Sequence, residues 1–295
     1  MRIGIDLGGT KTEGVVLCNR GEIIHRLRRS TPQAEGYHAV LDSIVQLVAE
    51  LETRAGTPCT VGIGTPGSLS PDTALMRNSN TTCLNGQPLL ADLIGLLARD
   101  IRIANDANCF ALSEASDGAA ASADVVFGII LGTGTGGGIV INGKIIKGAQ
   151  QIAGEWGHNP LAAESRPCYC GRVDCVETYL SGPGLVQTWQ RNGGEKDITT
   201  RDIVALTAKG DARALTTLDH YHAHFARALA NVINILDPDV VVLGGGLSNI
   251  ESLYDQGIKA LEPYIFSDTL RTRVVKNKHG DSSGVRGAAW LWDVL

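Results

Sequence analysis

The sequence of 295 residues has few aromatic side chains, no excess of basic charge and no long apolar run. Aromatic residues make up only 5% of the chain, so its cores must be built mainly from aliphatic side chains. The 26 lysines and arginines stand against 31 aspartates and glutamates, which gives a net charge of −5. This mild acidity argues against a nucleic-acid partner, because proteins that bind nucleic acids usually present a basic stripe.

Signals for membranes and secretion are also lacking. The longest uncharged segment, residues 125–143, contains seven glycines, which is typical of strands around a turn. Arg2 and Asp6 leave no room for the apolar core of a signal peptide. We therefore expect a cytoplasmic protein with no membrane partner.

The chain has 43% hydrophobic residues, enough for sizeable cores, and its length predicts about two domains. A strand, a glycine turn and a second strand at residues 2–18 recur at residues 125–146. Helical periodicity follows, first at 35–52 and later at 211–235. This repeat predicts two α/β domains of similar build. Ser248, with the capping-box spacing to an acid three residues on, predicts the start of a further helix.

The seven cysteines do not indicate a disulfide framework, because their number is odd and four are scattered among apolar patterns. The other three, Cys168, Cys170 and Cys175, follow His158. Three thiolates and one imidazole can fill a closed, tetrahedral, structural zinc site, whereas three free thiols in a loop are the alternative.

Three histidines of the helix expected over 211–235 do not predict a second metal site. His220, His222 and His224 have no third-ligand motif beside them, so we expect them on a solvated helix face.

The first glycine turn reads Asp6-Leu7-Gly8-Gly9-Thr10-Lys11. Glycines let backbone N–H groups approach phosphate oxygens, Thr10 and Lys11 can donate to phosphate, and Asp6 can hold Mg²⁺ through water. A strand follows where a Walker motif has a helix. An ordinary hairpin with a Gly-Gly turn is the alternative.

Two further glycine segments are candidates for nucleotide contacts. Residues 132–137 match the spacing of a dinucleotide fingerprint, but a strand and a hairpin follow instead of a helix. We interpret this turn as the partner of the first one, with the two clamping a triphosphate; a glycine-lined bend against another backbone is the alternative. Gly244, Gly245 and Gly246, after a buried strand, would let an adenosine approach the backbone.

Asn105-Asp106-Ala107-Asn108 lies where a strand meets a helix. Helix capping alone explains such residues. A phosphoryl transferase, however, needs one carboxylate to accept the proton of the attacking hydroxyl. Asp106 is our candidate for that base.

These motifs, with Gly154-Glu155-Trp156-Gly157-His158 and the segment from Cys168 to Glu177, occur in the order of the ROK (repressor, open reading frame, kinase) family of sugar kinases, which the whole chain resembles. The resemblance implies an actin-like fold (hexokinase-type, ribonuclease H-like) of two α/β domains with a ligand cleft. We place the N-terminal domain at residues 1–115, completed by a C-terminal helix at 283–295. The C-terminal domain, with the zinc-binding segment, is expected at 116–282.

The resemblance also implies roles for single residues. Asp106 would be the catalytic base, and His158 would bind zinc through one ring nitrogen and the sugar through the other. The expected contacts to the sugar are Gly67, Asn80, Asn105, Asp106, Glu155, His158 and Glu177. The expected contacts to ATP with Mg²⁺ are Gly4, Ile5, Asp6, Leu7, Gly8, Gly9, Thr10, Lys11, Gly132, Thr133, Gly134, Thr135, Gly136, Gly137, Gly138, Ile139, Gly244, Gly245 and Gly246. The expected ligands of a structural Zn²⁺ are His158, Cys168, Cys170 and Cys175.

The sequence departs from the family's zinc segment at one position, where Asp174 replaces a glycine. Residues 78–88 and 156–161 resemble the fructokinase, or manno(fructo)kinase, branch. We therefore expect transfer of phosphate from ATP to D-fructose, giving fructose 6-phosphate, by a homodimer. N-acetylglucosamine kinase, which shares residues 108–114, and glucokinase are the alternatives. A sugar-sensing regulator without catalysis is the non-enzyme alternative.

Overall fold

The computed structural model describes residues 1–292, which form two compact units. Unit 1 comprises residues 1–124, 138–153 and the described part of 278–295, and unit 2 comprises residues 125–137 and 154–277. This division differs from the boundary that we expected after residue 115. The chain stays with unit 1 as far as Asp124 and returns to it after the second glycine turn.

Unit 1 is built on a five-stranded sheet of order β3-β2-β1-β4-β7. The predicted meander at its start is antiparallel, and β1, β4 and β7 run parallel. The strands are β1 (Arg2–Leu7), β2 (Lys11–Leu17), β3 (Ile23–Ser30), β4 (Thr60–Thr65) and β7 (Ile101–Asn105). A small hairpin of β5 (Ser68–Leu69) and β6 (Met76–Arg77) follows β4.

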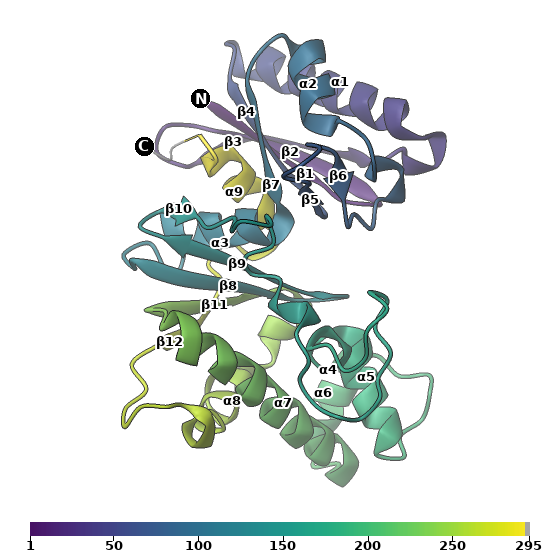
Figure 1. Cartoon of the computed structure of the whole chain (residues 1–295), viewed down its shortest axis with the longest axis vertical. Coiled ribbons are helices and arrows are strands. Elements are labelled where there is room, and N and C mark those ends of the chain that lie inside the picture. The colour runs from purple at the N-terminus through teal and green to yellow at the C-terminus, as the bar shows by residue number, and fades with distance from the viewer. Residues whose placement is uncertain (293–295) are drawn as a thin grey trace. The chain divides into compact units, whose positions relative to one another are not determined.

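Helices cover both faces of this sheet (Figure 1). An added Cβ at Gly14 would meet Leu47 and Leu51 of α1 (Tyr37–Ala55), whereas one at Gly4 would lie 2.0 Å from the carbonyl oxygen of Val285 in α9 (Ser283–Trp290). Gly14 pairs with Ile5, the neighbour of Gly4, and successive strand residues face opposite sides. Thus α1 and α9 lie on opposite faces.

The remaining helices of unit 1 are α2 (Leu89–Leu97), α3 (Asp106–Ser116) and the short 3₁₀ turns η1 (Gln33–Glu35), η2 (Thr82–Leu84) and η7 (Gly280–Ser282). The predicted helix over 35–52 is α1. The terminal helix expected over 283–295 is α9, and its last positions, 293–295, lie outside the described residues.

The second sheet has the order β10-β9-β8-β11-β12, which repeats the pattern of the first. Its strands are β8 (Val125–Leu131), β9 (Thr135–Ile141), β10 (Lys144–Ile145), β11 (Val240–Gly244) and β12 (Arg273–Lys276). In both sheets the third strand of this order pairs in parallel with the fourth, so the sequence repeat corresponds to a repeat of topology. Among residues 1–292, no helix combines the length and apolar character needed to cross a membrane.

Unit 2 contains α4 (Glu177–Leu180), α5 (Gly182–Arg191), α6 (Thr200–Ala208), α7 (Ala212–Leu236) and α8 (Gln256–Lys259), with the 3₁₀ turns η3 (Trp156–His158), η4 (Gly246–Asn249), η5 (Glu251–Tyr254) and η6 (Glu262–Tyr264). The helix predicted to begin at Ser248 is wrong, because only η4 and η5 form there. The Ser248 hydroxyl donates to the Gly245 carbonyl at 2.7 Å instead of capping a helix.

The predicted solvated face of α7 is also wrong for two of its three histidines. His222 and His224 are buried, and burial lowers the pKa of both, that of His224 to about 4. His222 Nε2 lies 2.9 Å from the Ser252 hydroxyl, and the His224 ring lies against Tyr179 with centroids 4.5 Å apart. The Ser252 hydroxyl thus compensates one polar ring atom of His222, whereas His224 Nδ1 is buried without a hydrogen-bond partner.

Candidate active site

Asp106 is the first residue of α3, directly after β7 ends. The side chain of Asn105 caps this helix, because its Oδ1 accepts the Ala107 N–H at 2.9 Å. Asp106 Oδ1 accepts the same N–H at 2.8 Å. Asn105 therefore accounts for the capping that was the alternative reading of this motif. A carboxylate in the first turn is also stabilised in its ionised form by the helix dipole.

Gly67 brings a second loop to Asn105. The Asn105 Nδ2 donates to the Gly67 carbonyl at 3.2 Å. Gly67 has φ of +79°, and an added Cβ would lie 2.3 Å from the Arg77 carbonyl oxygen, so only glycine fits. The structure thus places Gly67 against residues 77–79, next to the exposed Asn80.

The first glycine turn closes tightly between β1 and β2, with the Gly8 N–H donating to the Lys11 carbonyl at 3.0 Å. Thr10 and Lys11 are exposed. Asp6, at the end of β1, is half-buried, and burial raises its pKa to about 6; Glu13 adds to the effect and Lys11 opposes it.

Asp6 and Asp106 belong to the same edge of the first sheet, because parallel strands β1 and β7 both end there. Burial raises the pKa of the Cys109 thiol, and the negative charges of both carboxylates raise it further. Ligands of open α/β sheets bind at the carboxyl ends of strands. Unit 1 therefore brings an acid from the first glycine turn and the candidate base to one end of its sheet.

The second glycine turn is fixed by Glu177 of unit 2. Glu177 Oε2 accepts the Thr135 N–H at 2.8 Å, and an added Cβ at Gly134 would lie 2.6 Å from that oxygen. Gly137 packs against the Gly154 carbonyl, as the alternative interpretation of this segment requires, but Gly132 faces open space. The turn thus serves close packing at one end and is open at the other.

The third glycine segment, residues 244–246, also combines a tightly packed glycine with an open one. Gly245 has φ of +80°, and an added Cβ would lie 2.4 Å from the Leu131 carbonyl oxygen. Gly246, in contrast, has open space where a side chain would stand. Close packing therefore requires Gly245, whereas Gly246 leaves room for a ligand.

The four expected metal ligands come together in unit 2. One donor atom from each of His158, Cys168, Cys170 and Cys175 lies within 4.8 Å of all the others. Cys168 Sγ lies 3.7 Å from His158 Nδ1, and the Sγ atoms of Cys170 and Cys175 are 3.6 Å apart. A tetrahedral zinc with bonds of about 2.3 Å to sulfur requires ligand separations of about 3.5–3.8 Å. The donor set and its spacing fit zinc.

Asp174 explains how the metal segment tolerates its departure from the family pattern. The residue is buried with φ of +59°, a conformation that aspartate adopts more readily than most residues. Its carboxylate accepts the N–H groups of Glu164, Ser165 and Arg166 at 3.3, 3.0 and 2.9 Å, and the Tyr179 hydroxyl at 2.5 Å. A side chain that glycine lacks therefore ties the segment together.

Arg166 and Tyr179 connect the metal segment to α4 and α5. The Arg166 side chain is 2% exposed, and its guanidinium lies 4.0 Å from the centre of the Tyr179 ring. It donates to the Thr178 carbonyl and to the Thr188 hydroxyl, both at 3.1 Å. Because Glu177 begins α4, this packing also fixes Glu177.

The three residues expected to contact a sugar from unit 2 influence one another. Burial raises the pKa of Glu155; His158 opposes this shift and Glu177 adds to it. Sequence reasoning missed one neighbour: the Tyr169 hydroxyl lies 3.1 Å from His158 Nε2. Tyr169 lies between Cys168 and Cys170 in the sequence, and no sequence pattern pointed to it.

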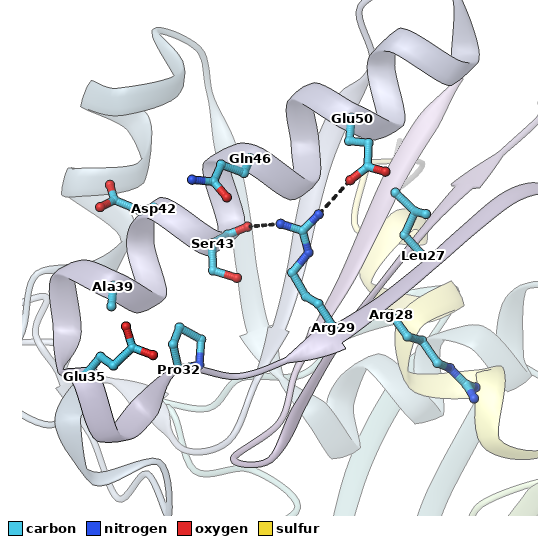
Figure 2. A pocket seen from close by; sticks show the side chains of 10 residues that line it. All are labelled: Leu27, Arg28, Arg29, Pro32, Glu35, Ala39, Asp42, Ser43, Gln46 and Glu50. Atoms are coloured by element: carbon cyan, nitrogen blue, oxygen red, sulfur yellow. Dashed lines mark hydrogen bonds and ion pairs between the residues drawn. The ribbon is translucent and has the colours of Figure 1, made fainter.

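A groove of about 580 Å³ lies elsewhere on unit 1, between β3 and α1 (Figure 2). Its lining includes Arg29, which donates to the Ser43 carbonyl at 3.3 Å and to Glu50 at 2.8 Å. None of the expected site residues lines it. This groove is therefore not the site that the sequence predicts.

Comparison with known proteins gives consistent matches along the whole chain. The N-acetyl-D-glucosamine kinases of Escherichia fergusonii and Citrobacter koseri are each 40% identical to it over 301 residues, covering 99% of both proteins. The ROK hexokinase of Thermus thermophilus has a TM-score of 0.86 at 28% identity, covering 98% of this chain and 96% of that chain. The ROK glucokinase of Streptomyces griseus, solved with glucose and AMPPNP, has a TM-score of 0.80 at 27% identity, covering 98% of each.

These structural matches confirm the expected actin-like, hexokinase-type fold of two α/β domains. The family model described as "ROK family" matches residues 2–294, which is nearly the complete sequence. The chain therefore belongs to the ROK family.

Proposed function

We propose that this chain is an ATP-dependent sugar kinase that phosphorylates the 6-hydroxyl of N-acetyl-D-glucosamine. The observation that supports this acceptor is the 40% identity, over 99% of both chains, to proteins named N-acetyl-D-glucosamine kinases. Our expectation of fructose has no such support and is replaced by what was its alternative. ATP as the phosphoryl donor is supported by the glucokinase relative solved with AMPPNP.

The loop that suggested fructose has a structural explanation. Asn85 Oδ1 accepts the Ser79 N–H, and Asn85 Nδ2 donates to the Ser79 carbonyl, both at 2.9 Å. Asn85 and Ser79 therefore stabilise the loop to which they belong. Their presence says little about which hydroxyls a sugar carries.

Asp106 carries the chemistry in this proposal. The sugar hydroxyl oxygen attacks the γ-phosphorus, the bond from that phosphorus to the leaving ADP oxygen breaks, and the hydroxyl proton passes to Asp106. The carboxylate lies in the first turn of α3, where the helix dipole favours negative charge. Asn105, Glu155, His158 and Glu177 would bind the other hydroxyls, with Gly67 and Asn80 shaping their surroundings.

The glycine turns would bind the nucleotide. Backbone N–H groups within residues 8–11 and 132–137 would donate to phosphate oxygens, apart from those of Gly8, Gly132 and Thr135, which already have partners in the chain. Gly246 leaves space for the adenosine. Asp6 would hold Mg²⁺ through water; when bound, this ion would neutralise phosphate charge. His158, Cys168, Cys170 and Cys175 would hold Zn²⁺, which would stabilise the fold of their segment.

An ADP-release assay with N-acetylglucosamine, fructose, glucose and N-acetylmannosamine tests the proposal. We expect kcat/KM for N-acetylglucosamine to exceed that for fructose at least about tenfold, a difference that a few hydrogen bonds provide. A preference for fructose would restore our original expectation. No turnover of any sugar at high enzyme concentration would favour the regulator.

A further inference from the structure

Tyr169 lies between two metal ligands and contacts a third. It separates Cys168 from Cys170 in sequence, and its hydroxyl lies 3.1 Å from His158 Nε2. The two rings meet edge to face, with centroids 5.3 Å apart and an angle of 81°. Tyr169 is nevertheless 82% exposed, so little packing opposes a movement of its ring.

The other nitrogen of His158 determines which atom donates in this contact. His158 Nδ1 faces Cys168 Sγ at 3.7 Å and is therefore the nitrogen that faces the metal ligands. An imidazole that binds metal through one nitrogen carries its proton on the other. His158 Nε2 is then a donor, and the Tyr169 hydroxyl oxygen accepts its proton.

We propose that Tyr169 is a positioning and specificity-determining residue whose hydroxyl takes the place of a sugar hydroxyl on His158 Nε2 until substrate binds. This inference rests on the proposed function, because it requires a sugar hydroxyl at that nitrogen. A sugar hydroxyl and a phenol offer the same kind of acceptor oxygen, and one N–H cannot serve both fully.

Two effects of opposite sign follow from this competition. Without sugar, Tyr169 orients the imidazole and so strengthens metal binding, as outer partners of metal-bound histidines generally do. With sugar, the phenol must leave, which weakens apparent sugar affinity. Tyr169→Phe keeps the ring and removes only the hydroxyl. Changes in metal binding or in sugar affinity in this variant therefore do not come from lost packing.

The test measures release of Zn²⁺ into a chromogenic chelator, with and without saturating N-acetylglucosamine, together with KM for the sugar. Without sugar, we expect Tyr169→Phe to release Zn²⁺ about tenfold faster than wild type. With sugar, release from the variant slows to the wild-type rate, because the sugar hydroxyl replaces the phenol. KM for N-acetylglucosamine falls about two- to tenfold with kcat unchanged, the value of one neutral hydrogen bond.

The matched control is Tyr264→Phe, which removes a tyrosine hydroxyl from η6, outside the metal segment. This variant should release Zn²⁺ at the wild-type rate. Equal release from wild type and Tyr169→Phe without sugar would overturn the inference. Faster release that sugar fails to slow would also overturn it, since a merely structural tyrosine behaves that way. Failure of the proposed function would instead appear as wild-type protein that turns over no sugar.

Discussion

Glu177, the first residue of α4, accepts the backbone N–H of Thr135 in the second glycine turn at 2.8 Å. A residue that we proposed for the sugar therefore also determines the shape of a segment that we proposed for phosphate. Both belong to unit 2, so this connection lies within one compact unit.

Glu177→Ala should impair ATP use as well as sugar use. Loss of a charge-assisted hydrogen bond costs about 1.5–3 kcal/mol, so we expect kcat/KM for ATP to fall about 10- to 100-fold. Glu177→Gln keeps an acceptor oxygen and should fall between the alanine variant and wild type. Steady-state kinetics in both substrates measure this, with the exposed Glu195→Ala as the control. An unchanged KM for ATP in Glu177→Ala would contradict the second role.

Asp106→Asn should abolish catalysis and preserve the fold. Asparagine can still accept the Ala107 N–H, and Asn105 still caps α3, but an amide cannot take a proton. We expect kcat to fall about 10²–10⁴-fold with sugar binding largely retained. Stopped-flow or coupled assays give kcat, and thermal unfolding serves as the control. A variant with near-wild-type kcat would require another base.

Asp6 should make folding stability depend on pH. Its pKa is about 6 in the folded chain against 3.8 as reference, so the folded state binds this proton more tightly than the unfolded state. The free energy of unfolding therefore falls as pH rises from about 4 to about 6, by on the order of 2 kcal/mol from this group. Lys11 and Glu13 are the charges that act on it.

Asp6→Asn isolates that dependence. Urea unfolding of wild type and variant across pH 4 to 8 should show the two curves diverging as pH rises, with the variant more stable above pH 6. Mg²⁺-dependent turnover should be lost at the same time. Parallel curves would show that Asp6 titrates alike in both states.

Asp174→Gly should destabilise the metal segment although it restores the family's glycine. The change relieves a positive φ but removes four hydrogen bonds to one buried carboxylate. We expect a loss of about 1–3 kcal/mol in the free energy of unfolding, measured by denaturant titration with and without prior chelation. Asp174→Asn, which keeps part of the acceptor set, should lose less. A more stable glycine variant would show that backbone strain outweighs the hydrogen bonds.

Local pattern was sufficient to predict the framework of the fold. The recurring strand, glycine turn and strand correspond to the two sheets, because each meander pairs within itself before the chain travels further. The convergence of the three thiols and His158 could also be predicted from the sequence, because ligands that are close in sequence come together at little entropic cost.

Contacts between residues that are distant in sequence could not be predicted in the same way. His222 and His224 are polar on a buried helix face, and their partners, Ser252 and Tyr179, lie about 30 to 45 residues away. The return of residues 138–153 to unit 1 and the choice of sugar likewise depend on contacts that no local motif encodes.

The packing of α9 against the rest of unit 1 has a consequence for folding during translation. An added Cβ at Gly62 would lie 1.9 Å from the Ala288 carbonyl oxygen, and one at Gly287 would lie 1.6 Å from that of Cys109. Helix α9 thus packs on residues that leave the ribosome long before it does. Val15 and Leu17 share a core cluster with Val285 and Ala289, so this part of the core of unit 1 can form only after α9 has been synthesised.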